Sequence, residues 1–224
     1  MNQTDSVEGV TNKLGKPGGA AEELLLKGIA QAFTDSDEVG LDATVRELRL
    51  DEQALESAIR LYEASHEDRM LRWAIVYLAA KIGAAGTAQW FRRVVDDELP
   101  ALPPGAAQGC QSPRDEEVLV RVMAVEGLAR RDASKATTEE GLEALAAIAG
   151  AHDDAAVRSA AVLQLLRIRP GAAAELRLRL PDDSMHLLDA RLHAQPTDLG
   201  EGLEPGGLVA PSSGLPPMTT HKGD

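Results

Sequence analysis

The chain has 224 residues, of which 44% are hydrophobic and only 3% aromatic, and its formal net charge is -13. This size allows one buried core, and the prevalence of Ala, Leu, Arg and Glu favours helices over a β-sandwich. The excess of acidic residues repels phosphate groups and argues against nucleic-acid binding.

Membrane insertion is not expected. The longest uninterrupted apolar segment, residues 73–80, is far shorter than the roughly 20 residues that cross a bilayer. No N-terminal stretch combines a charged start with an apolar run, as a secretion signal would. The single cysteine, Cys110, cannot form an internal disulfide and fits a reducing compartment. We therefore predict a cytoplasmic protein.

Residues 1–19 lack apolar periodicity and end in Lys-Pro-Gly-Gly, which predicts a disordered lead. Helical spacing of apolar residues then recurs from Ala20 to Ala194 and defines the predicted domain, 20–194. A capping-box pattern at 65–68 and a C-terminal glycine, Gly83, delimit one of its helices. The predicted helices span 20–33, 36–48, 51–64, 65–83, 87–99, 113–131, 137–150, 153–170, 171–180 and 182–194.

Two segments interrupt or follow this pattern. Residues 100–113 are rich in proline and glycine, so they predict a loop that is long for a compact domain. Ser112, Pro113 and Asp115 together predict the start of the next helix. The tail, residues 195–224, contains five prolines and six glycines and is predicted to be disordered.

Two short segments leave the secondary structure open. Residues 175–180 alternate between polar and apolar side chains, and residues 44–50 do so in part. Alternation with period two is typical of a half-buried strand. A short strand therefore competes with a helix at both places.

An acidic residue precedes an arginine by four positions three times, with apolar residues at fixed offsets after the arginine. Apolar residues stand three and seven positions after the second and third arginines, whereas the first copy is looser. The arginines are 49 and 37 residues apart, close to the length of a two-helix or three-helix repeat of about 40–47 residues. The three pairs are Asp68 and Arg72, Glu117 and Arg121, and Asp154 and Arg158.

This pattern resembles that of HEAT-repeat proteins over roughly residues 51–194. The resemblance implies an all-α, right-handed helical-repeat solenoid with disordered termini. In such a stack, each acid would cap the start of an inner helix, and each arginine would reach the acid of the next unit and set the register between repeats. The competing interpretation is an ordinary i,i+4 ion pair, worth about 0.2–0.5 kcal/mol.

Motifs for nucleophilic catalysis, phosphate cradling and dinucleotide binding are absent from the sequence. Cys110 has no neighbouring histidine, so we interpret it as an incidental thiol. His186, Asp189 and His193 have the spacing of metal ligands on one helix, but a solvated polar face is the preferred interpretation. We predict no catalytic residue, no cofactor and no metal.

An enzyme on a HEAT-like scaffold, similar to the bilin lyases or to a metal-dependent hydroxylase, is the alternative. The His-acid pairs at 66–67 and 152–153 resemble those of deoxyhypusine hydroxylase. In that family, however, the pair is expected just after the Val-Arg element, where this chain has Trp73, Val122 and Ser159. Helix capping explains the pairs better.

Aromatic residues concentrate between positions 62 and 91. Trp73 and Tyr77 are predicted to pack in the core, whereas Trp90, beside Arg92 and Arg93, is predicted to be an exposed anchor for a partner. We expect a non-enzymatic protein-interaction module: an adaptor, an assembly factor or an inhibitory, immunity-type binder. Residues 20–194 carry a net charge of -10, so the expected partner is a protein with a basic surface.

Overall fold

The computed structural model describes residues 17–33, 38–101, 112–130 and 139–188, and within these ranges the chain is helical without any β-strand. The predictions for residues 1–16 and for 189–224, including Asp189 and His193, lie outside the described residues. The same holds for Cys110 and most of the predicted loop at 100–113.

From α2 to α9, the helices follow the predicted order with small shifts at their ends. None of those in the described ranges is long and apolar enough to cross a bilayer. They are α2 (Ala20–Ala32), α3 (Glu38–Leu48), α4 (Ala54–Ala64), α5 (Arg69–Ile82), α6 (Thr87–Asp96), α7 (Pro113–Ala129), α8 (Glu139–Ala151), α9 (Ala155–Ile168) and α10 (Ala173–Leu176).

Side-chain caps explain where three of these helices begin. Asp68 accepts a hydrogen bond from the backbone of α5, and Asp154 does the same for α9. Ser112 and Asp115 form a complete capping box at the start of α7. The box predicted at 65–68 is wrong, because the hydroxyl of Ser65 instead donates to a carbonyl oxygen inside α4.

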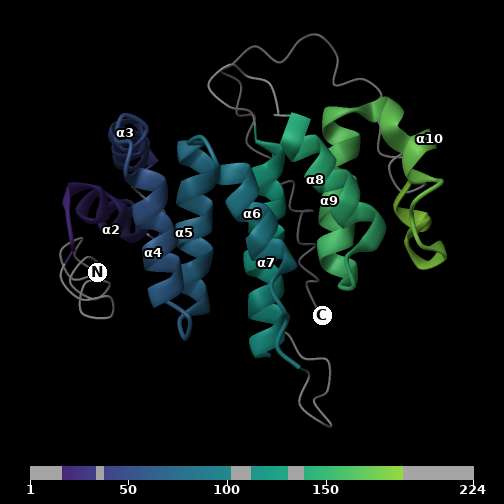
Figure 1. Ribbon diagram of the computed structural model, residues 1–224, viewed down its shortest axis with the longest axis horizontal. Coiled ribbons are helices and arrows are strands. Elements are labelled where there is room, and N and C mark those ends of the chain that lie inside the picture. Colours follow the sequence, from purple (N-terminus) through teal and green to yellow (C-terminus); the bar gives the residue numbers. More distant parts are fainter. Residues whose placement is uncertain (1–16, 34–37, 102–111, 131–138, 189–224) are drawn as a thin grey trace, which may run out of the picture.

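The helices pack as pairs arranged in a row (Figure 1). Helix α4 packs against α5, α6 against α7, and α8 against α9. The second helices of these pairs also contact one another in order, α5 with α7 and α7 with α9. Helices α2 and α3 pack against α4 and α5, and one apolar core runs from α2 to residue 188. Helices α5, α7 and α9 therefore form a row that α4, α6 and α8 cover on one side.

A glycine sets the close approach of α6 to α7. A Cβ atom at Gly127 would lie 2.2 Å from the ring of Phe91, which is fully buried. Only glycine leaves room for the ring at this position. Gly83, which ends α5, is a glycine for a different reason. Its φ of 65° lies in the left-handed region, which favours glycine.

Both segments with alternating polarity lack a strand. Residues 44–48 belong to α3, and residues 175–180 continue from α10 into turns. The single helix predicted at 171–180 is also wrong, since α10 has only four residues and follows a 3₁₀ turn. Leu176 and Leu180, four residues apart, are both buried, whereas Leu178 is 88% exposed. The turns thus anchor two leucines and leave the third in solvent.

Candidate protein-interaction site

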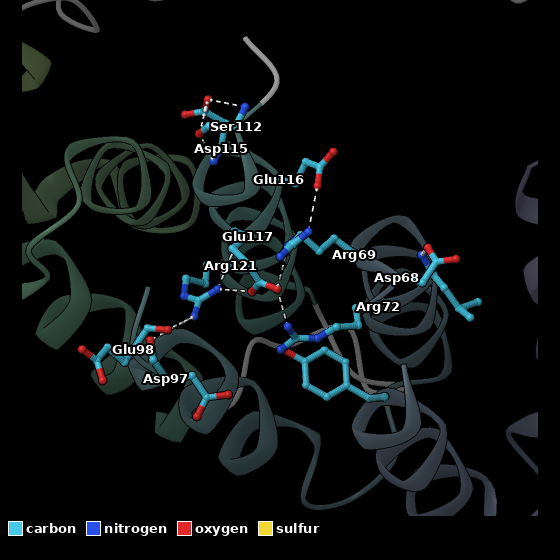
Figure 2. Close-up of polar contacts among 12 residues, drawn as sticks. Asp68, Arg69, Arg72, Asp97, Glu98, Ser112, Asp115, Glu116, Glu117 and Arg121 are labelled. Atoms are coloured by element: carbon cyan, nitrogen blue, oxygen red, sulfur yellow. Dashed lines mark hydrogen bonds and ion pairs between the residues drawn. The ribbon is translucent and has the colours of Figure 1, made fainter. Parts of the chain in front are cut away.

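A buried carboxylate, Glu117, lies at the centre of a polar network between α5 and α7. Its residue is only 4% exposed. The carboxylate binds the guanidinium groups of Arg72 on α5 and of Arg121 one turn further along α7, the latter at 2.6 Å (Figure 2). Arg69 contributes a third guanidinium at 3.7 Å. The network thus neutralises a charge that would be costly to bury alone.

The two arginines with identical flanking patterns have the same role. Arg121 donates to the carbonyl oxygens of Asp97 and Glu98, which follow the end of α6, at 3.0 and 3.1 Å. Arg158 donates to the carbonyl oxygens of His152 and Asp153, which follow the end of α8, at 2.7 and 2.9 Å. In both pairs, an arginine on the second helix satisfies carbonyl groups at the end of the first.

The arginine of the looser copy has different partners. Arg72 donates to the hydroxyl of Tyr62 on α4, and its guanidinium lies 4.2 Å from the centre of that ring. Burial raises the pKa of Tyr62, against the opposing effect of the Arg72 charge. Arg72 therefore joins α4, α5 and α7 through side chains rather than through backbone carbonyl groups.

The three acids fall into two classes. Asp68 and Asp154 cap the first turn of their helices, as expected. Glu117 does not, because Ser112 starts α7 five residues earlier. Arg72 reaches Glu117 in the next copy, whereas Asp154 is approached by Arg114, at 3.6 Å, rather than by Arg121.

Trp90 is buried, so the predicted exposed anchor is wrong. Only 3% of the residue is exposed, and its ring packs edge-on against Tyr62 at 5.5 Å. Helix α6 turns its apolar side towards α7 and carries Trp90 into the core. Arg92 bonds to Asp96 at 2.6 Å and to a carbonyl oxygen of α8, and Arg93 is exposed.

Large apolar side chains are instead exposed on α5, α7 and α9. Met70 is 53% exposed, Leu119 56% and Leu163 45%. Trp73 and Tyr77, both half-buried, stack on one another with their centres 5.4 Å apart. We call this set the apolar face, and its members are Met70, Trp73, Tyr77, Leu119, Val122 and Leu163.

The members of the apolar face on α5 and α7 share one side of the helix row, and Leu163 stands five positions after Arg158, as Tyr77 does after Arg72. Spacings of three and four residues align them within α5 and within α7. The guanidinium of Arg130, at the end of α7, lies 5.8 Å from the ring of Tyr77 on α5, which links the two helices on this side. The opposite side is covered by α4, α6 and α8. The apolar face thus points away from the covering helices.

A groove of about 370 Å³ lies where α6 and α8 end, beside the start of α7. Its arginines are already engaged, Arg92 as above and Arg114 with the carbonyl oxygen of Pro100 at 3.1 Å. The carboxylates at its rim are exposed. We call it the acidic groove, and its charged lining residues are Arg92, Asp96, Asp97, Glu98, Arg114 and Asp153.

The three histidines in the described ranges have structural contacts or face solvent. His152 accepts a hydrogen bond from the backbone N-H of Asp154 through Nδ1, and its Nε2 lies 3.2 Å from the carbonyl oxygen of Val95. His66 and His186 are exposed. Across the described ranges, no three His, Cys, Asp or Glu side chains are grouped so that they could hold a metal ion.

Trp73 and Tyr77 were predicted to pack in the core, but both are only half-buried. Both residues lie on the side of α5 opposite to Leu71, Ile75 and Leu78, which are buried. A helix that is apolar nearly all round is consistent with burial on every side, but equally with one side left for a partner.

Comparison with known proteins finds no matching family model, no matching curated protein and no matching solved structure.

Proposed function

We propose that this protein is a non-enzymatic protein-interaction module, acting as an adaptor, an assembly factor or an inhibitory, immunity-type binder. The apolar face carries the proposal. Helices α5, α7 and α9 each expose a large aliphatic or thioether side chain, and a stacked Trp-Tyr pair lies on α5. Exposed apolar side chains that gather on one side of a protein together with aromatic residues are typical of protein interfaces.

The architecture that we propose for this module is a HEAT-like, right-handed solenoid of helical pairs. The matching contacts of Arg121 and Arg158 support it, because each arginine binds the end of the helix that precedes its own in the pair. The ordered contacts of α5 with α7 and of α7 with α9 support it as well. In a repeat stack, the exposed sides of equivalent helices form one extended binding surface.

The net charge favours a partner that has a basic surface. The chain has a net charge of -13, and the acidic groove lies at the start of α7, five residues before Leu119. A basic partner would be steered towards the protein by this field. Steering should weaken with added salt, because charges are screened beyond about 10 Å at 0.1 M ionic strength.

A matched set of surface variants tests the proposal by co-purification from the native cell. Leu119→Glu and Leu163→Glu place a charge on the apolar face, whereas Leu178→Glu places the same charge at an exposed leucine outside it. We expect a partner that co-purifies with the unaltered chain and with Leu178→Glu, and that is lost with the other two. A partner retained by both face variants would contradict the proposal.

A further inference from the structure

A second charged cavity lies at the opposite end of α7 from the acidic groove. It has a volume of about 440 Å³, and α3, the end of α5 and Arg130 line it. Four of its seven lining residues are cationic and one is acidic, in a chain whose net charge is -13. We call it the basic pocket, and it consists of Asp42, Val45, Arg46, Arg49, Ala80, Lys81 and Arg130.

Two of the cations are held in place by contacts that leave donors available. Arg49 donates through Nη2 to the carbonyl oxygen of Lys81 at 2.7 Å, and through Nε to that of Ile82 at 3.3 Å. A guanidinium has five N-H donors, so donors remain for a ligand. The ammonium of Lys81 lies 3.6 Å from a carboxylate oxygen of Asp42, which is half exposed.

The negative ends of the helix dipoles do not offset all of the positive charge in the basic pocket. The four cations and Asp42 sum to +3. Helices α3, α5 and α7 end at the pocket, and each C-terminus carries roughly half a negative charge. The three ends together contribute about -1.5, which leaves about +1.5 in the cavity. Arg46 and Arg130 are exposed and supply the surplus.

The basic pocket adjoins the apolar face through one aromatic ring. The ammonium of Lys81 is 5.5 Å from the centre of the Tyr77 ring, and the guanidinium of Arg130 is 5.8 Å from it. Tyr77 in turn stacks on Trp73. The atoms next to the anionic groups of a ligand in the pocket would therefore contact the Tyr77 ring.

We propose that the basic pocket binds an acidic segment of the partner peptide chain, with clustered Asp or Glu side chains in the pocket and an apolar residue against Tyr77. The cations come from three separate elements, which suits several carboxylates along a chain better than one compact ion. Guanidinium groups bind carboxylates with directed, charge-assisted hydrogen bonds. The inference rests on the proposed function and specifies which part of the partner docks at this end.

The test uses a fluorescein-labelled oligoglutamate peptide that ends in leucine, with an oligoglutamine peptide of equal length as the neutral probe. Binding is followed by fluorescence anisotropy at low ionic strength. Arg46→Glu changes the charge inside the pocket, and Lys27→Glu makes the same change at an exposed position of α2 outside it. We expect Arg46→Glu and Arg130→Glu each to weaken oligoglutamate binding about tenfold, or about 1.4 kcal/mol, and Lys27→Glu to weaken it by less than about twofold.

Three results would overturn the inference. Oligoglutamate and oligoglutamine could bind equally; Lys27→Glu could weaken binding as much as Arg46→Glu; or inorganic phosphate at matched ionic strength could displace the peptide as well as free oligoglutamate does. Partner co-purification separates this failure from that of the proposed function. If pocket variants retain a partner that Leu119→Glu loses, the pocket assignment fails and the interaction module stands.

Discussion

The junctions on either side of α7 are built from the same sequence pattern but are held together differently. Between α5 and α7, Glu117 is buried and binds arginines from both helices. Between α7 and α9, the equivalent acid, Asp154, caps a helix and forms an ion pair with Arg114 at 3.6 Å. The cause is the start of α7, which Ser112 sets five residues before Glu117.

This difference shows that the position of an acid relative to its helix start decides its energetic role. An N-capping carboxylate stays near solvent and satisfies free backbone N-H groups. A carboxylate one turn further in is carried into the interface, where only several close cations can offset its desolvation. The two junctions should therefore respond differently to substitution.

The largest effect is expected at the charged junction. Glu117→Ala would leave Arg72 and Arg121 buried without their carboxylate, and should lower the free energy of unfolding by about 3–5 kcal/mol. Urea unfolding followed by far-UV circular dichroism measures it. Glu116→Ala, which removes a partly exposed carboxylate 3.5 Å from Arg69, should cost less than about 1 kcal/mol. Equal losses for the two variants would show that the network adds no stability to this junction.

Apolar packing should stabilise both junctions. Leu128 on α7 and Leu165 on α9 are buried at equivalent offsets from their arginines. Each substitution to alanine should lower the free energy of unfolding by about 2–5 kcal/mol, because it removes buried surface and leaves a cavity. Leu163→Ala, at an exposed position of α9, should change it by no more than about 0.5 kcal/mol. Small losses at all three positions would contradict the assignment of the buried side.

A smaller effect is expected where the acid only caps its helix. Asp154→Ala removes hydrogen bonds to the backbone N-H groups of Ala156 and Val157 and should cost about 1 kcal/mol in urea unfolding. Arg114→Ala removes a partly buried ion pair at 3.6 Å and should cost less than that. If Asp154→Ala were as destabilising as Glu117→Ala, the contrast between the junctions would be lost.

The smallest effect is a pH dependence at the start of α7. Hydrogen bonds from Ser112 hold the pKa of Asp115 below its ordinary value of 3.8. Because the folded pKa is the lower one, Asp115 stabilises the fold above pH 3.8, and this contribution is lost as the pH falls through the lowered pKa. Unfolding measured against pH should therefore show a shallower acid loss for Asp115→Asn than for the unaltered chain. Identical pH profiles would rule out the contribution.

Features that depend on neighbouring residues in the chain could be predicted from the sequence. The burial of residues that pack against distant segments could be predicted less well. The caps at Ser112 and Gly83 depend on backbone groups within a few residues, so the sequence predicts them. Trp90 and Trp73 are both aromatic residues on amphipathic helices, and nothing local separates them. Trp90 is buried because α6 lies against α7, whereas Trp73 is left on the side of α5 away from α4. Trp73, rather than Trp90, is therefore the partly exposed tryptophan.

The sequence by itself determined that the described chain is helical, where most of its helices begin and end, and that arginines recur at matching offsets. These properties follow from backbone propensity, capping and helical periodicity, which act over three to seven residues. Only the tertiary structure decided that Glu117 is buried, that the apolar face is left uncovered, and that Arg46, Lys81 and Arg130 meet in one pocket. Burial and charge clustering depend on which helices pack together, and Arg46 and Arg130 of the basic pocket lie 84 positions apart in the chain.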